Sequence, residues 1–564
     1  MKIKLIILSI VVIFSGIIRL LYLDRIPVGI NDDELHFVLN AKSIFYGFSN
    51  LEGNANPFKL GEASSLIFAP IIGPLSTNLF TARLPYITIS CLTIILIYLI
   101  IFKLTKRFSL AITSALIAGI NPWSIYVSRT SFDAPIAIFF FLLTFYLLTF
   151  KKSKYIYLSI ITAFLAFNSY IGTKILLLPF IVISSYFLWK FNKKNGKQYL
   201  IVVLASLIIT LNFIFTLSSQ PIGKRMGELE TPYSQKIIDQ VNLERRQSIQ
   251  SESFKKILTN KYTIYSRNFI QKYLYNFSTD ILFLEGDHTA TGSLWKHGYF
   301  YYIDAVLILL GIVFLYINHR NFLILISSFI LLSPIPEAIR SDSIPAYVFH
   351  SSFQYPYLFI LIAAGFLLLW QIFSNKYLRF FLVFIYLLSF INFIDIYFLK
   401  SPAYQPESFA FSHRIISNYI KLESNKNREI YVLTREPEVL FRSYLFFSNS
   451  YQKNNFNLIK NIYSQSKENM SLNNIHFISH NKYLPSGENY TLIFDTDNFD
   501  YGQQDQKYFV SRLSDAGRIY SIYRGSTCQN INLQTYPNNI KIKDLKVEKL
   551  NEKDFCERYI TSEL

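Results

Sequence analysis

The chain has 564 residues, of which 51% are hydrophobic and 17% aromatic, whereas only 16% are charged. This composition and the positive mean hydropathy lie outside the range of ordinary soluble domains and predict a polytopic α-helical membrane protein. The formal net charge of +18 does not imply nucleic-acid binding, because many of the basic residues lie in short loops between apolar segments.

A helix needs about 20 apolar residues to cross a hydrocarbon core of about 30 Å. Eleven segments are candidates, and they lie near residues 5–23, 82–102, 108–127, 134–150, 155–171, 173–190, 199–217, 300–317, 321–334, 353–373 and 378–399. We therefore expect about 11 transmembrane helices in residues 1–399, followed by a separate tail at 400–564.

Basic residues mark one side of the predicted membrane. Lys2 and Lys4 precede the first segment, and no small-residue cleavage site follows before Asp24, so this segment reads as an uncleaved anchor. The short loops on the same side carry Lys103, Lys106, Arg107, Lys151, Lys152, Lys154, Lys190, Lys193, Lys194, Lys197, His319, Arg320, Lys376 and Arg379. The positive-inside rule makes this side cytoplasmic. In the cell (inner) membrane, the loops at 24–80 and 218–298 and the whole tail would then be extracytoplasmic.

Three consecutive acids follow the first segment, in the stretch Asn31-Asp32-Asp33-Glu34-Leu35-His36-Phe37. They suit the first turn of a helix, where negative charge contributes about 1 kcal/mol. The apolar residues Phe37, Val38, Ala41, Ile44, Phe45 and Phe48 recur at helical spacing, and we expect their stripe to lie in the membrane interface. The alternative is catalytic, because a carboxylate held at a bilayer surface can serve as a general base.

Two further outer segments carry candidate cations. Arg129 and Asp133 are four residues apart, so a local ion pair at a helix end competes with a role in binding. Tyr170 and Lys174 begin the next apolar run on the outer side. Snorkelling to headgroups would explain this lysine, and contact with an anionic substrate is the other interpretation.

The loop before the eighth segment is rich in polar residues. It contains Tyr275-Asn-Phe-Ser-Thr-Asp280, then Glu285-Gly-Asp287-His288, and His297-Gly298. A divalent metal held by Asp287, His288 or His297 is compatible with this pattern but not required by it.

The tail predicts a small α/β domain. Glu429–Leu433, Tyr490–Phe494 and Arg518–Tyr523 have the composition of strands, and Glu436–Phe447 is typical of a helix. Asp495-Thr-Asp497 is interpreted as a strand-to-turn junction. Cys528 and Cys556 both lie in the tail, where a disulfide is permitted by compartment but not established by spacing.

Several of these motifs resemble one family. Asp33-Glu34-Leu35-His36-Phe37 is similar to the Asp-Glu-x-His-Phe motif of protein O-mannosyltransferases. Pro122-Trp to Ser128-Arg129 and the Phe277-Ser-Thr-Asp280 to His297-Gly298 segment resemble bacterial family-39-type and aminoarabinose transferases. These are GT-C glycosyltransferases, and the resemblance implies a GT-C-like membrane domain that uses a polyprenyl-phosphate-linked sugar donor and inverts the anomeric centre.

The resemblance also implies roles for individual residues. Asp33 would be the general base, with Glu34 supporting it and Asp32 as the alternate. Substrate contacts would come from His36, Arg129, Asp133, Tyr170, Lys174, Asp287, His288 and His297. The acceptor, which could be a protein, a lipid or a glycan, is left open.

Two departures from the family pattern matter. The Asp-His-Pro-Pro motif of the mannosyltransferases is missing, and Phe58-Lys-Leu-Gly-Glu62 stands nearby, which argues against true protein mannosylation. A His-x-x-Arg pattern before the tenth segment is also missing, and Arg340 or His350 is the candidate substitute.

Two rival functions remain. A surface-glycan polymerase or ligase would share the donor type. A secondary transporter or lipid flippase would need charged mid-span residues and inverted repeats, whereas here the charges crowd into loops and no repeat is found.

Overall fold

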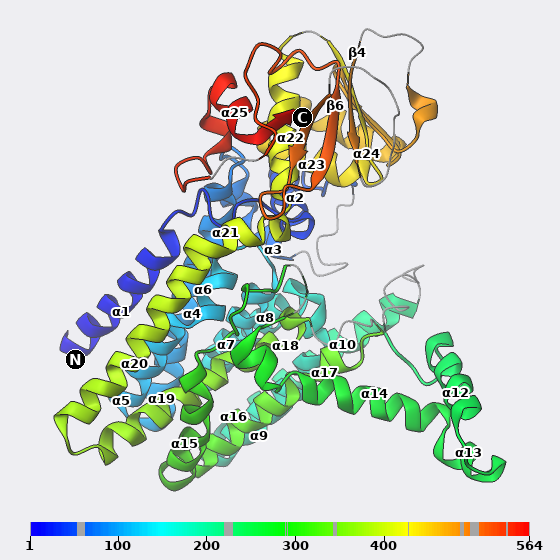
Figure 1. The fold of residues 1–564 in the computed structure, drawn as a ribbon. Coiled ribbons are helices and arrows are strands. Elements are labelled where there is room, and N and C mark those ends of the chain that lie inside the picture. The colour runs from blue at the N-terminus through cyan, green and yellow to red at the C-terminus, as the bar shows by residue number, and fades with distance from the viewer. Residues whose placement is uncertain are drawn as a thin grey trace. The chain divides into compact units, whose positions relative to one another are not determined.

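The computed structural model describes residues 2–53, 63–218, 229–287, 289, 291–341, 347–426, 428–484, 490–496, 507–536 and 540–562, the side chains of 216–218 excepted. The ribbon is drawn in Figure 1. Unit 1 consists of Met1–Ser15, Ile89–Ile125 and Ala134–Phe393, and unit 2 of Gly16–Thr88, Tyr126–Asp133 and Ile394–Leu564. The second unit thus joins the tail to two segments from the first 133 residues, whereas the sequence suggests a boundary between 399 and 400.

The described part of residues 1–400 is mainly helical. They are α1 (Lys2–Leu20), α2 (Asp32–Gly47), α3 (Ala63–Ile72), α4 (Leu79–Thr105), α5 (Phe108–Ile120), α6 (Pro122–Ser128), α7 (Ala134–Leu148), α8 (Ser153–Ser169), η1 (Ile171–Leu176), α9 (Leu177–Phe191), η2 (Lys193–Asn195), α10 (Gly196–Ser218), α12 (Gln235–Gln247), α13 (Glu252–Leu258), α14 (Lys261–Tyr275), η3 (Asp280–Leu284), α15 (Tyr302–Asn318), α16 (Arg320–Leu332), α17 (Ile335–Ala338), α18 (Val348–Ser351), η4 (Ser352–Gln354), α19 (Tyr355–Ile372), α20 (Lys376–Asp395) and η5 (Ile396–Lys400).

Each of the eleven predicted apolar segments coincides with one or more of these helices. Within the described residues, seven helical stretches are long and apolar enough to cross a membrane, or eight if the bent pair α5 and α6 forms one span. Three shorter apolar helices, α3, α7 and α15, accompany them. The protein is therefore a multi-pass membrane protein.

Close packing in unit 1 is clearest between α15 and α19. A side-chain carbon on Gly311 of α15 would collide with the carbonyl oxygen of Leu361, and one on Gly365 of α19 would collide with that of Leu307. Glycine at both positions lets the two backbones approach, as is common where helices pack inside a membrane. Beyond the spans, α12 packs on α14 through Ile237, Val241 and Ile264.

The tail contributes a seven-stranded mixed sheet to unit 2 (Figure 1), with strand order β2-β3-β1-β4-β6-β5-β7. Its strands are β1 (Glu429–Leu433), β2 (Asn469–Leu472), β3 (Ile475–Ile478), β4 (Tyr490–Asp495), β5 (Lys507–Ser511), β6 (Arg518–Tyr523) and β7 (Ile560–Ser562). Strand β1 is parallel to both of its neighbours, to β3 with Ile430 opposite Ile475 and to β4 with Glu429 opposite Tyr490, and the other pairings are antiparallel. The strands predicted at 429–433, 490–494 and 518–523 are confirmed.

Helical segments complete the tail. They are α21 (Ser401–Tyr404), η6 (Pro406–Phe409), α22 (Phe411–Ser424), α23 (Pro437–Phe447), η7 (Lys453–Asn455), α24 (Phe456–Gln465), η8 (Asn481–Tyr483), η9 (Val547–Lys549) and α25 (Glu552–Tyr559). The predicted helix at 436–447 corresponds to α23, and α22 and α23 pack against each other and against the sheet. A small α/β domain is therefore present in the tail, as expected.

Within unit 2, α2 packs against α3 and against α23 and α24 of the tail. Val38, Ala41 and Ile44 are buried, whereas Phe45 and Phe48 are exposed. The predicted apolar stripe is therefore divided, because α3 and the tail helices pack on α2.

Cys528 and Cys556 form a disulfide, with their Cα atoms 5.6 Å apart. The bond links the segment after β6 to α25, which the cysteine spacing alone left open. Cys91 of α4 is half-buried and is not part of this disulfide.

Candidate active site

The acidic stretch forms the start of α2, and its local sequence explains why. The side chain of Asn31 accepts a hydrogen bond from the Glu34 amide at 2.9 Å, and Glu34 Oε2 accepts one from the Asn31 amide at 3.2 Å. This reciprocal capping box satisfies two amides that a helix start leaves unbonded. Asp32, Asp33 and Glu34 fill the first turn, where the helix dipole favours negative charge.

Glu34 is fully buried and holds a distant segment. Its Oε1 accepts a hydrogen bond from the Ser131 amide at 2.7 Å and lies 3.9 Å from Nε of Arg83. Burial raises the pKa of Glu34, although Arg83 and the bonds from Ser131 and Asn31 oppose the rise. Glu34 thus ties the start of α2 to residues 126–133, and this contact supports the helix.

Two buried arginines brace the chain that leads into α2. Arg83 donates to the carbonyls of Pro27 (2.9 Å) and Gly29, and Arg129 donates to those of Arg19 (2.5 Å) and Ile26 (2.8 Å). The Arg129 guanidinium also lies 4.7 Å from the ring centre of Phe398. These contacts to backbone carbonyls are structural, and the role of Arg129 in binding stays a prediction. Arg83 was not predicted as a site residue. Its place inside an apolar segment could have indicated it, because charged residues are rare in such segments.

Asp32 and Asp33 differ in environment. Asp32 Oδ2 lies 2.8 Å from Nη2 of Arg442, a largely buried residue of α23 that also contacts Glu438 at 3.2 Å. Asp33 is exposed to solvent. Of the three consecutive acids, Asp33 is therefore the one whose carboxylate is most accessible to a substrate.

His36 and Asp133 lie on the same unit as these acids. Nε2 of His36 is 2.9 Å from Nδ2 of Asn40, whose Oδ1 accepts a bond from the Leu51 amide at 3.0 Å. Asp133 is buried and close enough to Tyr86 to interact with it electrostatically. Glu34 and Asp33 lie next to each other in sequence and also interact electrostatically.

The remaining predicted residues belong to unit 1. Tyr170 is buried with its ring 5.7 Å from that of His350, and a side-chain carbon on Gly172 would lie only 2.8 Å from both rings. Lys174 is also buried, and its Nζ lies 4.4 Å from the ring centre of Phe167 and 4.6 Å from that of Phe213. A snorkelling lysine would extend its ammonium group to the lipid headgroups, whereas this ammonium group lies close to two aromatic rings.

His350 is part of a polar cluster in unit 1. Its Nδ1 lies 2.8 Å from Oε2 of Glu337, and Nη1 of Arg340 lies 3.5 Å from the same oxygen. Nearby, Nζ of Lys272 lies 3.0 Å from Oε2 of Glu230 and donates a hydrogen bond to the carbonyl of Arg340. Arg340 and His350, the two candidate substitutes for the missing pattern, are thus neighbours. Glu337, the acid that joins them, was not predicted from sequence.

Asp287 organises the loop before α15. Its Oδ1 accepts from the Thr289 amide at 2.7 Å, and its Oδ2 accepts from the Val348 amide at 2.8 Å. Burial raises the pKa of Asp287 despite these bonds. Through these two hydrogen bonds, Asp287 links its own loop to the start of α18.

The metal prediction involves the same loop. His297 is buried, its Nδ1 lies 2.6 Å from the Gly298 carbonyl, and burial lowers its pKa. His288 lies outside the described residues, as do residues 58–62 and Asp497. Among the described residues, no group of three or more His, Cys, Asp or Glu side chains could hold a metal ion. The metal site therefore stays a prediction.

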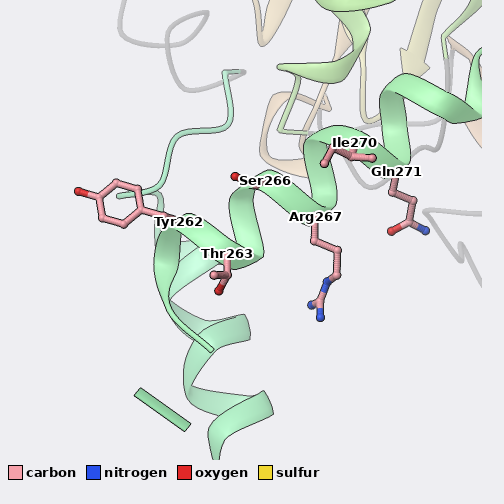
Figure 2. A pocket seen from close by; sticks show the side chains of 6 residues that line it. All are labelled: Tyr262, Thr263, Ser266, Arg267, Ile270 and Gln271. Carbon is pink, nitrogen blue, oxygen red and sulfur yellow. The ribbon is translucent and has the colours of Figure 1, made fainter. Parts of the chain in front are cut away.

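A hollow of about 720 Å³ lies along α14, bordered by Tyr262, Thr263, Ser266, Arg267, Ile270 and Gln271. Figure 2 shows that all six side chains come from this one helix. A single helix face does not enclose a substrate, and none of the predicted site residues borders it.

The candidate residues thus fall into two groups, one in each unit. Asp32, Asp33, Glu34, His36, Arg129 and Asp133 belong to unit 2, and Tyr170, Lys174, Asp287 and His297 belong to unit 1.

Comparison with known proteins identifies the fold. No protein-family model matches the chain, and no curated protein matches it by sequence. ArnT from Cupriavidus metallidurans in the apo state is similar in structure, with a TM-score of 0.52 and 11% identity over 91% of this chain and 97% of that chain. The same ArnT bound to undecaprenyl phosphate gives a TM-score of 0.45 and 11% identity over 91% and 97%.

A third solved structure is the archaeal oligosaccharyltransferase AglB from Archaeoglobus fulgidus, in complex with an inhibitory peptide and a dolichol-phosphate. It gives a TM-score of 0.45 and 10% identity over 93% of this chain and 74% of that chain. The likeness to apo ArnT carries the assignment. The chain has a GT-C-like fold, with a transmembrane helical part and a small sheet domain at its C-terminal end.

Proposed function

We propose that this protein is a membrane glycosyltransferase that moves a sugar from a polyprenyl-phosphate donor to an acceptor on the extracytoplasmic face, with Asp33 as general base. The observation that carries the proposal is the exposed carboxylate of Asp33 in a motif like that of protein O-mannosyltransferases, on a chain with a GT-C-like fold. ArnT, whose apo form supplies the fold likeness, has also been solved with undecaprenyl phosphate, a lipid of the proposed donor class.

The proposed reaction needs few groups. The Asp33 carboxylate takes the proton of the acceptor hydroxyl as its oxygen bonds to the anomeric carbon. The bond between that carbon and the donor phosphate oxygen breaks, and the electron pair leaves with the polyprenyl phosphate. Because phosphate is already a good leaving group, cations that stabilise its charge suffice, and no acid is required. Attack opposite the leaving group inverts the anomeric centre.

The other two acids support this assignment by their positions. Glu34 is buried and bonded to Ser131, so it acts as a positioning residue for the helix that carries Asp33. Asp32 is engaged with Arg442 of the tail. A base must reach the acceptor, and Asp33 is the exposed member of the three.

Lys174 is the proposed phosphate contact among the cations. Its ammonium group lies close to the rings of Phe167 and Phe213, whose faces attract a cation. The remaining predicted residues, His36, Asp133, Tyr170, Asp287, His288 and His297, are proposed to shape the binding surfaces. A divalent metal is not needed for this mechanism.

The decisive experiment offers the purified protein a panel of polyprenyl-phosphate sugars with protein, lipid and glycan acceptors. Release of polyprenyl monophosphate with one donor, lost on Asp33→Asn, would support the proposal and identify the sugar. Release of polyprenyl diphosphate from a diphosphate-linked glycan would instead indicate a surface-glycan polymerase or ligase. Movement of intact lipid-linked sugar across vesicles without release would indicate a flippase and overturn the proposal.

The orientation is part of the proposal and has its own test. Lys194→Cys and Asn461→Cys, each in a Cys91→Ser background, place a thiol at an exposed position of a predicted cytoplasmic loop and of the tail. An impermeant thiol reagent added to intact cells or spheroplasts should label only the tail position. Labelling of the loop position instead would reverse the orientation and remove Asp33 from the proposed face.

A further inference from the structure

Unit 1 contains a hollow of about 760 Å³ at the ends of several helices, and none of the predicted site residues that the structure describes lines it. It is bordered by the ends of α4, α7 and α9, the start of α10, and the junction of α15 with α16. Five basic side chains line it, and we call it the basic hollow; they are Lys103, Lys106, Lys151, His319 and Arg320.

No carboxylate belongs to the basic hollow. None of its lining residues is Asp or Glu, and the chain has no acid within residues 97–110, 145–160, 185–203 or 314–325. The positive-inside rule explains why these loops carry cations. It does not explain why five side chains from three separate stretches of the chain border one hollow. Converging cations without a built-in acid favour an external anion.

The rim of the hollow is held by specific contacts. Asn195 donates to the Lys151 carbonyl at 3.1 Å, and Arg107 donates to Asn318 Oδ1 at 2.9 Å. Tyr199 donates to the Leu148 carbonyl at 3.3 Å. These bonds join neighbouring loops and helix ends, so the cations are carried on a connected frame.

The lining favours a lipid headgroup over a soluble ion, because apolar side chains lie next to the cations. Phe187, Phe191 and Phe322 line it beside the cations. On the adjoining helices α9 and α10, Trp189 and Leu200 are exposed, as is Phe191 itself. A phosphate group among cations next to exposed apolar helix faces is the chemistry of a phospholipid at a membrane surface.

We propose that the basic hollow binds the phosphate headgroup of an anionic phospholipid, with its acyl chains along α9 and α10. Lys106, Lys151 and Arg320 are exposed and supply the charge that meets the headgroup. Lys103 lies over the ring of Phe150 at 3.1 Å, which fixes its ammonium group at the wall. The proposal does not depend on the glycosyltransferase function.

The test uses full-length protein in detergent and native mass spectrometry, with titrations of phosphatidylglycerol and phosphatidylcholine. The hollow variant is Lys106→Gln/Lys151→Gln/Arg320→Gln. The matched control is Lys154→Gln/Lys194→Gln/Lys376→Gln, which removes the same charge from the same predicted side of the membrane at positions that do not line the hollow.

The wild-type and control proteins should prefer phosphatidylglycerol. The hollow variant should bind it about 100-fold more weakly, since each cation near an anionic headgroup contributes roughly a five-fold factor. Thermal unfolding in detergent checks that all forms are folded. Arg320→Gln alone, with an expected loss of about five-fold, serves if the triple variant does not fold.

Three outcomes would overturn the proposal. Equal losses in the hollow and control variants would mean that only overall charge matters. An equal affinity for phosphatidylcholine would remove the requirement for a net anion. Binding of glycerol 1-phosphate or inorganic phosphate as tight as that of the lipid would assign the hollow to a soluble phosphate compound and eliminate the role of the acyl chains.

Discussion

The start of α2 and the basic hollow are both rich in charge, yet they use it differently. At α2, Glu34 is bonded to Ser131 and close to Arg83, Asp32 is paired with Arg442, and the arginines bind backbone carbonyls. In the hollow, cations gather with no acid among the lining residues. Most charges in the first region therefore hold the fold together. The charges that we propose for binding or catalysis are the exposed carboxylate of Asp33 and the cations of the hollow.

Removing the buried acid should have the largest effect on the first region. Glu34→Ala leaves the Ser131 amide and Arg83 buried without this acceptor, and breaking a buried charged contact costs about 3–5 kcal/mol. Unfolding in detergent, with hydrogen exchange at Ser131 and Asn31, would measure it. Glu52→Ala removes an exposed partner of Lys467 and should cost less than about 1 kcal/mol. Equal losses would show that Glu34 is not a buried support.

Asp33→Asn should have the next largest effect, and on turnover rather than on stability. The change keeps the shape of the side chain and removes the basic carboxylate, so turnover should fall by about 10²-fold or more. Single-turnover release of polyprenyl phosphate measures the loss, and the melting temperature should stay at the wild-type value. Near-normal turnover would transfer the role of base to Asp32 or eliminate it.

Lys174→Gln should reduce kcat by about 10-fold or more while changing donor binding less, because a cation facing the leaving phosphate stabilises charge that grows in the transition state. Lys174→Arg preserves the charge and should retain part of the activity. Steady-state kinetics with donor titration separates the two effects. If the Gln variant loses only stability, the lysine serves merely to bridge Phe167 and Phe213.

Asp32→Asn is the matched control for Asp33, since the same charge is removed one residue away. The Asp32–Arg442 pair is partly exposed, so its loss should cost about 1 kcal/mol or less. Turnover should remain within about five-fold of wild type, because this carboxylate is engaged with the tail. A double-mutant cycle with Arg442→Gln measures the coupling. A loss of turnover as large as that of Asp33→Asn would contradict the assignment of the base to Asp33 alone.

The smallest expected effect is a pH dependence at Glu34. Burial raises its pKa above the ordinary value of 4.5, so the folded protein holds this proton more tightly than the unfolded chain does. The resulting stabilisation is complete below the ordinary value and is lost as the pH rises through the folded value. The stability of wild type relative to the non-titrating Glu34→Gln should therefore fall over that interval. If this relative stability rose with pH instead, the contacts with Arg83 and Ser131 would lower the pKa of Glu34 by more than burial raises it.

The sequence predicts local features of this protein well. Apolar length locates the helices, β-branched and aromatic composition locates β1, β4 and β6, and Asn31 with the three acids suits the start of α2. The sequence does not predict which residues far apart in the chain contact each other. Nothing near Glu34 predicts that its partner is the Ser131 amide, and nothing near Asp32 points to Arg442. Arg129 matched a family motif, yet its donors are used by the backbone, which only the folded chain reveals.

The composition of unit 2 has a consequence for biosynthesis. Its first segment ends at Thr88 and its last begins at Ile394, so roughly 300 residues are translated in between, which takes about 15 to 60 s at about 5–20 residues per second. Throughout that interval the side of α2 that later packs on α23 and α24 has no tail to cover it. The nascent chain must therefore hold α2, with its apolar residues and its three acids, without the tail helices that later pack on it. A tail expressed alone would likewise lack the Asp32 that its Arg442 contacts and the Val28 carbonyl that its Arg414 binds at 2.5 Å.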